Sequence, residues 1–252
     1  MKKPQKQFVL IHGLSREARH WGDFPEFLRQ QFPLAAIHTP DIPGNGLLHQ
    51  MSSPKTIAGM TEKIREQIAF RNNLNLVAIS MGAMIAIDWM SRYVSEINTA
   101  VLINTSARPV AAFYHRLRWQ IYPTILKMLF LSKSRREQEI LALTSNRHSQ
   151  DNQLLNNWLQ WQQDDPVSAV NALNQLIAAA RFTLPSKPPQ PMLIVTSTAD
   201  RLVNNSCSLN LQQTWQTAYR QHERAGHDLA LDDPGWLATQ IGQWQCSLSD
   251  SS

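Results

Sequence analysis

The chain has 252 residues, of which 43% are hydrophobic, and it carries a formal net charge of +5. This length is ample for one domain with a buried core, and no apolar run approaches the ~20 residues that a transmembrane helix needs, so we expect no membrane span. The first apolar run, residues 8–11, is shorter than the roughly 7–15 residues of a signal-peptide core, which favours a core strand and a cytoplasmic protein.

Short apolar runs alternate with helical patterns along most of the chain. Strands separated by helices favour a parallel sheet with right-handed crossovers, so the sequence predicts an α/β fold. The runs predict strands near residues 8–11, 35–39, 74–79, 99–104, 191–197 and 217–222, and the periodic segments predict helices near 17–31, 56–71, 81–93, 206–214 and 233–246.

The alternation stops after residue 104 and resumes at residue 191, an interval too long for a single crossover. We therefore interpret residues 105–185 as an inserted helical cap, with residues 1–104 and 186–252 forming the core. One apolar stripe in the cap recurs every four residues and contains Pro123, which is expected to kink or break it. The two stripes of the cap are Phe113, Leu117, Ile121, Ile125 and Leu129, and then Val167, Val170, Leu173 and Ile177.

Ser80 lies between an apolar run and a helical pattern. A tight turn from strand to helix needs small residues two positions before and after its apex, and it lifts the apical side chain clear of the backbone. Ala78 and Gly82 occupy those two positions. The usual pattern is G-x-S-x-G, so Ala78 replaces the first glycine. Ser80 is thus a candidate nucleophile.

A serine nucleophile needs a base that takes its proton and a group that orients the base. Asp200 follows the apolar run 191–197, and His227 lies in a loop marked by Gly226. Upstream, the first strand runs into His12-Gly13-Leu14, a turn that can aim a backbone N–H group at a developing oxyanion.

With these motifs, the loop 41–46 (Asp-Ile-Pro-Gly-Asn-Gly) and the segment 198–203 (Thr-Ala-Asp-Arg-Leu-Val), the chain resembles the α/β-hydrolase superfamily over nearly its whole length. The resemblance implies an α/β-hydrolase fold with a mostly parallel sheet flanked by helices. It further implies Ser80 as nucleophile, His227 as base and Asp200 as the group that orients the base. The backbone N–H groups of Leu14 and Met81 would form the oxyanion hole.

Three other carboxylates lie close to His227 in the sequence. Asp228 is adjacent to it, and a side chain rarely reaches the ring of its own neighbour. Asp232 and Asp233 precede a helix that starts with Pro234, an arrangement typical of helix N-caps. Asp200 is therefore the preferred partner of His227.

The remaining histidines show no pairing at metal-ligand spacing, and the two cysteines form no ligand or redox motif, so we expect no metal site. The chain also lacks a dinucleotide or phosphate-binding glycine loop, and we expect no cofactor. His12 is expected to orient its own loop, and His20 and Trp21 to line the pocket rim or the core.

Positive charge is concentrated in one segment. Residues 108–147 contain eight Lys or Arg and two acids, for a net charge of +6. No nucleic-acid-binding pattern accompanies this charge, so we expect no nucleic-acid partner. The segment is either a solvated helix face or a surface that attracts an acidic substrate or partner.

These observations predict a serine hydrolase that cleaves a small-molecule or carrier-bound carboxylic ester through an acyl-enzyme. In its size and its basic cap, the chain resembles the carboxylesterases of the superfamily that remove methyl esters from carrier-bound acyl chains. It also resembles the small hydrolases and lyases of quinone-precursor synthesis. Two alternatives remain open: a lyase or thioesterase of the same superfamily, or a non-catalytic ligand-binding member of it.

Overall fold

The computed structural model describes residues 6–128 and 130–249, with the side chain of Phe113 excepted. Six strands form one sheet in the order β2-β1-β3-β4-β5-β6, and every neighbouring pair is parallel. The predicted α/β fold is thereby confirmed. The strands are β1 Gln7–Ile11, β2 Ala36–His38, β3 Leu74–Ile79, β4 Ile97–Ile103, β5 Met192–Ser197 and β6 Ala218–His222.

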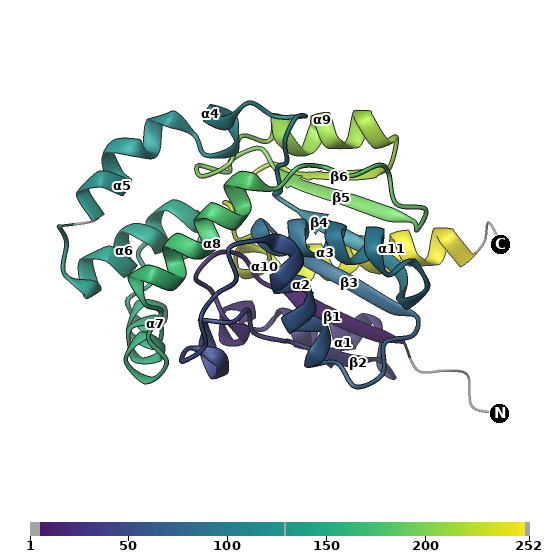
Figure 1. The fold of residues 1–252 in the computed structure, drawn as a ribbon, viewed down its shortest axis with the longest axis horizontal. Coiled ribbons are helices and arrows are strands. Elements are labelled where there is room, and N and C mark those ends of the chain that lie inside the picture. Colours follow the sequence, from purple (N-terminus) through teal and green to yellow (C-terminus); the bar gives the residue numbers. More distant parts are fainter. Residues whose placement is uncertain (1–5, 129, 250–252) are drawn as a thin grey trace.

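Helices cover both faces of the sheet (Figure 1). Alternate residues of a strand point to opposite faces, so Val9 and Ile11 join one apolar cluster, with α2, α3 and α9, while Phe8 and Leu10 join the other, with α1 and α11. Among the described residues, no helix is long and apolar enough to cross a membrane. The helices of the core are α1 Phe24–Gln31, α2 Ile57–Glu66, α3 Met81–Arg92, α9 Ser206–Trp215, α10 Leu229–Asp232 and α11 Pro234–Ser249.

Five further helices lie between β4 and β5 and gather beyond the carboxyl ends of the strands, at the opposite end of the molecule from both termini (Figure 1). We call them the cap helices. They are α4 Phe113–Arg116, α5 Tyr122–Met128, α6 Lys133–Thr144, α7 Asn152–Asp164 and α8 Ala169–Arg181.

The prediction of one helix over residues 17–31 was wrong in its extent. The structure has a short 3₁₀ turn, η1 Ala18–Trp21, and then α1. Gly22 separates the two with a φ of 51°, which ends the first turn, and Pro25 stands in the first turn of α1.

The stripe expected over residues 113–129 does not form one helix. It is divided into α4, the 3₁₀ turn η4 Trp119–Ile121, and α5. Pro123 lies in the first turn of α5, where its missing N–H group would have had no partner, so the helix starts there instead of kinking. Leu129 lies outside the described residues.

Helix α8 buries its polar side. Gln175 is fully buried, and Asn171 is nearly so, whereas Val170 and Leu173 are 67% and 55% exposed. The reason is the loop beneath α8: the Asn171 side chain accepts the N–H of Ser53 at 2.9 Å and donates to the carbonyl of Met51 at 3.0 Å. Backbone groups of a buried loop need such partners, so the amide side chains face inward.

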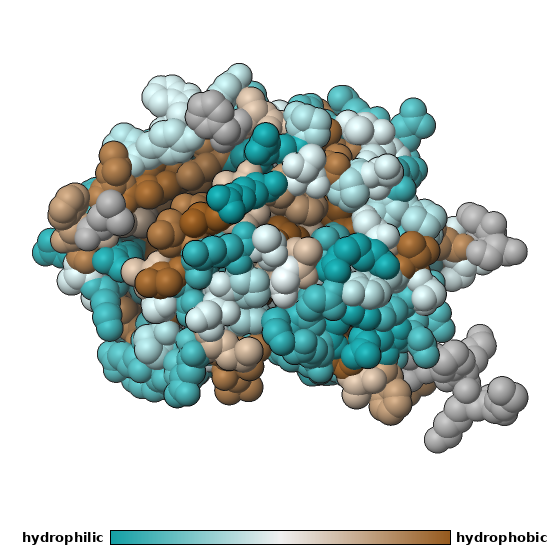
Figure 2. Space-filling view, viewed as in Figure 1, coloured by the Kyte–Doolittle hydropathy of each residue, from teal (hydrophilic) through white to brown (hydrophobic). Residues whose placement is uncertain are grey.

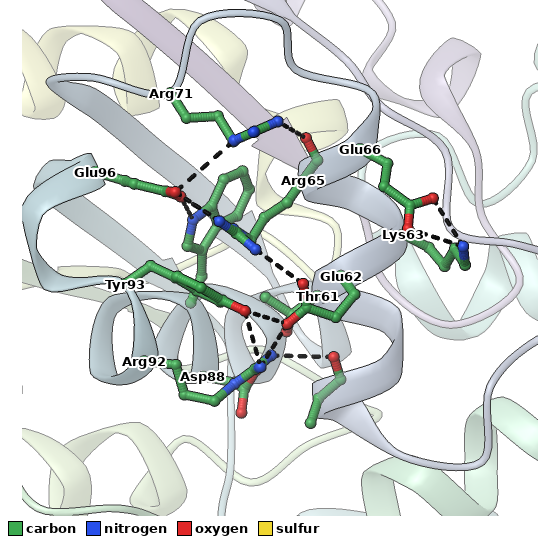
Figure 3. A network of polar contacts seen from close by, with 12 residues as sticks. Thr61, Glu62, Lys63, Arg65, Glu66, Arg71, Asp88, Arg92, Tyr93 and Glu96 are labelled. Carbon is green, nitrogen blue, oxygen red and sulfur yellow. Dashed lines mark hydrogen bonds and ion pairs between the residues drawn. The ribbon is translucent and has the colours of Figure 1, made fainter.

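A network of ion pairs holds α2 against α3 (Figure 3). Arg65 of α2 pairs with Glu96 at 2.6 Å, and Arg92 of α3 pairs with Glu62 of α2 at 2.5 Å. The Tyr93 hydroxyl donates to the same Glu62 carboxylate. Because α3 follows Ser80 directly, this network stabilises the helix that starts at the candidate nucleophile.

Candidate active site

Ser80 stands alone between β3 and α3, with φ 58° and ψ −120°. An L-residue rarely adopts a positive φ, and such strain persists only where the surroundings enforce it. The Ser80 N–H donates to the carbonyl of Ile103 at 2.8 Å, and the Ser80 carbonyl accepts the Thr105 hydroxyl at 3.0 Å. The end of β4 therefore holds the turn in its strained shape, and the Ser80 side chain remains partly exposed.

The turn also depends on Gly82. A Cβ atom there would lie 2.2 Å from the carbonyl oxygen of Ile11 and 2.5 Å from that of His12. The end of β1 thus passes directly over the first turn of α3. A Cβ atom on Gly13 would lie 3.2 Å from Ser80 Cβ, so the His-Gly turn lies against the candidate nucleophile.

His227 and Asp200 are paired. The Nδ1 atom of His227 lies 2.7 Å from Oδ2 of Asp200, and both side chains are buried. The other carboxylate oxygen of Asp200 accepts the N–H groups of Leu202 at 2.7 Å and Val203 at 2.9 Å. The carboxylate is therefore held at both oxygens, and it orients the ring through Nδ1.

The surroundings raise the pKa of His227. Burial alone would lower this pKa, but the charge of Asp200, its hydrogen bond to the ring and the charge of Asp228 together outweigh burial. The protonated ring is thus stabilised by its neighbours.

The backbone N–H groups of Leu14 and Met81 have no hydrogen-bond acceptor among the described residues. The next N–H group along the first loop is occupied, because Ser15 donates to Oε1 of the buried Gln175 at 2.8 Å. One cap side chain thereby fixes the loop that carries Leu14.

Asn104, which follows β4, was not predicted as a site residue. Its side chain donates to the carbonyl of His227 at 2.8 Å and accepts the N–H of Ser197 at 2.8 Å. It therefore ties the His227 loop to the end of β5. Its place directly after a strand, at the edge where parallel strands end, was the available signal.

The two expected N-caps differ. Asp233 does cap α11, because its Oδ1 accepts the N–H of Trp236 at 3.1 Å. For Asp232 the prediction was wrong: its buried carboxylate accepts the N–H groups of Gly226 at 2.6 Å and Asn146 at 2.9 Å. Asp232 instead connects the residue before His227 to the segment after α6.

The other candidates are placed as follows. His12 accepts the N–H of Gly13 on Nδ1 at 2.8 Å, and its Nε2 lies 3.5 Å from the carboxylate of Asp228. His20 is buried against the rings of two tryptophans, and burial, with the charge of Arg16 next, lowers its pKa well below the ordinary value. His12 shapes its loop, and His20 belongs to the core.

Neither cysteine suggests chemistry. Cys207 is buried, and burial raises the pKa of its thiol to about 12. Within the part of the chain that the structure describes, no group of three or more His, Cys, Asp or Glu residues could hold a metal ion.

The sheet is parallel, and at one of its edges a strained serine turn, an aspartate after β5 and a histidine after β6 follow three strands. This combination is typical of one class of α/β proteins, the α/β hydrolases. The sequence matches the alpha/beta hydrolase family over residues 8–240, and the chain belongs to that family. A search of curated proteins gave no match.

Solved structures share this fold at low identity. A bacterial membrane phospholipase A aligns with a TM-score of 0.79 and 18% identity over 98% of this chain and 81% of its own. The esterase RhEst1 from Rhodococcus sp. ECU1013 aligns with a TM-score of 0.76 and 13% identity, over 97% of this chain and 91% of its own. The 2-hydroxy-6-oxo-6-phenylhexa-2,4-dienoate hydrolase from Rhodococcus sp. strain RHA1 aligns with a TM-score of 0.74 and 16% identity, over 95% of this chain and 90% of its own. Family membership supports a hydrolase, and these likenesses support the fold.

Proposed function

We propose that the protein is a serine hydrolase that cleaves a carboxylic ester through an acyl-enzyme on Ser80. The observation that carries the proposal is the buried His227–Asp200 pair, 2.7 Å apart, at the same edge of the sheet as the strained Ser80 turn. A histidine held by a buried carboxylate is the arrangement that activates a serine hydroxyl.

The proposed reaction follows from these groups. The Ser80 hydroxyl attacks the ester carbonyl while Nε2 of His227 takes its proton, and Asp200 stabilises the resulting imidazolium through Nδ1. The imidazolium then protonates the departing alcohol, which leaves an acyl-enzyme. Water then attacks this ester while His227 takes its proton. His227 returns that proton to the Ser80 oxygen as the acyl–oxygen bond breaks, which releases the carboxylic acid and regenerates free Ser80.

The oxyanion hole is proposed to consist of the N–H groups of Leu14 and Met81. Both groups lack an acceptor among the described residues. Met81 follows Ser80 directly, and Leu14 follows Gly13, where a Cβ atom would lie 3.2 Å from Ser80 Cβ. A donor of this kind is worth about 10²–10³ in kcat.

Residues 105–185 are proposed to cap this site. The end of α6 and the residues after it contact both loops that carry the candidate catalytic groups. The N–H of Asp228 donates to the carbonyl of Thr144 at 2.8 Å, and the Asn146 side chain donates to the carbonyl of Ala199 at 3.1 Å. Substrate would therefore meet cap residues and catalytic residues together. A small-molecule or carrier-bound ester suits such a site.

Hydrolysis of p-nitrophenyl acetate and butyrate by purified variants tests the proposal. Ser80→Ala and His227→Ala should each lower kcat by roughly 10³-fold or more, with an unchanged melting temperature. The matched control is His148→Ala, because His148 also lies 3.2 Å from an aspartate, Asp151, and should retain full activity. Turnover by Ser80→Ala at the parent rate would refute the assignment.

A comparison of kcat/KM for an oxygen ester and a thioester with the same acyl chain distinguishes an esterase from a thioesterase. The proposal expects the oxygen ester to have the higher kcat/KM. A clear preference for the thioester would keep the triad and change the substrate class.

A further inference from the structure

The cap has an exposed apolar end. Leu126 on α5 is 61% exposed, and Phe130, in the turn that follows α5, is 89% exposed. The Phe130 N–H donates to the carbonyl of Lys127 at 3.0 Å, so Phe130 continues the last turn of α5. Figure 1 places the turn between α5 and α6 at the end of the molecule farthest from both termini.

The apolar surface extends to α8. Its outward face carries Val170, Leu173 and Leu176, which are 67%, 55% and 49% exposed. Figure 2 shows apolar side chains gathered over α5 and α8, with a hollow between them. Residues 105–185 hold seven of the twelve large hydrophobic side chains that are exposed in the described chain, although they make up about a third of it. Five of these seven side chains lie on α5, on α8 or in the turn after α5, which marks these elements as a candidate interaction surface.

Positive charge surrounds the same end. Lys133, Arg135 and Arg136, at the start of α6, are exposed and form no ion pair with any described residue. The two acids nearest to them in the sequence are already paired: Glu137 pairs with Arg16 at 3.0 Å, and Glu139 pairs with Lys127 at 2.6 Å. We call Leu126, Phe130, Lys133, Arg135 and Arg136 the cap tip.

We propose that the cap tip docks the protein on an anionic lipid surface. Apolar side chains beside cations match the boundary between acyl chains and headgroups, where the apolar groups enter the hydrocarbon and the cations meet the lipid phosphates. The charges complement anionic headgroups. Phe130 favours lipid over an acidic protein, since attraction to acidic side chains alone would not need an aromatic ring that is almost fully exposed.

Docking in this way would bring the hollow between α5 and α8 to the lipid. Each Lys or Arg near an anionic surface strengthens binding about fivefold, and the effect weakens as salt rises. The surface lies outside the proposed catalytic groups, so binding should not need turnover.

Vesicle co-sedimentation of the full chain tests the proposal. The protein carries Ser80→Ala, so that the result does not depend on the proposed hydrolase activity. Phosphatidylcholine vesicles in which about a third of the lipid is phosphatidylglycerol should bind it at least ~10-fold more tightly than pure phosphatidylcholine vesicles do. Replacing all three tip cations with glutamine should weaken this binding by about 100-fold, and Leu126→Ser with Phe130→Ser should weaken it by about 10-fold.

Matched controls come from exposed residues elsewhere. Phe70→Ser removes an aromatic ring that is 78% exposed but lies outside the cap, and Lys55→Gln with Lys187→Gln and Arg224→Gln removes three exposed cations. Both should bind as the parent does, with unchanged melting temperatures for all variants. Equal binding to both vesicles, or equal loss in tip and control variants, would overturn the proposal. Absence of vesicle binding together with salt-sensitive binding to an acidic carrier protein would assign the tip to a protein partner instead.

Discussion

His227 can accept the serine proton only when its ring is neutral. Its pKa is raised by the charge of Asp200 and the hydrogen bond to it, which outweigh the lowering effect of burial. Below this raised pKa the ring is already protonated and cannot act as a base. We therefore expect kcat/KM to rise with pH, with a midpoint above the ordinary histidine value of 6.5. A pH–rate profile for a p-nitrophenyl ester measures it, and a midpoint below that value would contradict the pairing.

Asp200→Asn supplies the variant for the same experiment. Loss of the carboxylate charge should move the midpoint to lower pH and lower kcat by about 10²–10⁴-fold. Asp233→Asn is the matched control, since Asp233 caps α11 and lies 3.3 Å from His222 instead. Similar losses in both variants, with folding intact, would show that Asp200 is not the relevant carboxylate.

The sequence distinguished some of these carboxylates better than others. Asp200 was predictable because an apolar strand delivers it to the carboxyl edge of the sheet. Asp232 was not, because one of its partners, Ser145, lies 87 residues away in the cap. Local patterns describe caps and turns, but a contact between distant segments depends on how those segments are folded together.

The elbow between β3 and α3 requires glycine at one position only. A Cβ atom on Gly82 would lie 2.2 Å from a backbone carbonyl that cannot move without shifting β1. We expect Gly82→Ala to lower the free energy of unfolding by about 1–3 kcal/mol or more. Ala78→Gly, two residues before the serine, should cost only about 0.5–1 kcal/mol. Urea denaturation of both variants provides the comparison, and equal stability would show that β1 does not pass over α3 this closely.

Helix α8 buries its polar face and exposes apolar side chains, the reverse of an ordinary amphipathic helix. Gln175→Leu would leave the N–H of Ser15 and the groups of Asn45 and Ser53 without their partner. We expect it to lower the free energy of unfolding by about 2–5 kcal/mol. Leu173→Gln should change it by less than about 0.5 kcal/mol, because that side chain already faces solvent. If the leucine variant at position 175 proved the more stable, the buried polar face would be refuted.

Elements of the core were predictable for a simple reason. The four inner strands β1, β3, β4 and β5 are mostly apolar and buried, and all six strands fall within about two residues of their expected ends. The cap was predicted less well. Periodicity arguments assume that the apolar face of a helix is the buried one, and α8 violates that assumption.

At the scale of the whole molecule, the sheet brings together groups that are far apart in sequence. Ser80 follows β3, Asp200 follows β5 and His227 follows β6, and all these strands end at the same edge because they are parallel. Their order in the chain was readable from the sequence. The order of the strands in the sheet could not be predicted from the sequence, because it depends on long-range pairing that no local pattern encodes.

The cap helices contact the loop that follows β1 at two separate points. Gln175 of α8 accepts the N–H of Ser15, and Arg16 pairs with Glu137 of α6 at 3.0 Å. The loop beside Ser80 is thus fixed from two cap helices. This arrangement suits a site whose geometry is set before substrate arrives.

The central claim is that Ser80 is the nucleophile, and covalent labelling tests it most directly. The protein is treated with a fluorophosphonate, and the adduct is located by intact mass and peptide mapping. The account predicts a single adduct on Ser80, labelling that is much slower in His227→Ala, and none in Ser80→Ala. An adduct on another residue, or undiminished labelling of Ser80→Ala, would contradict it.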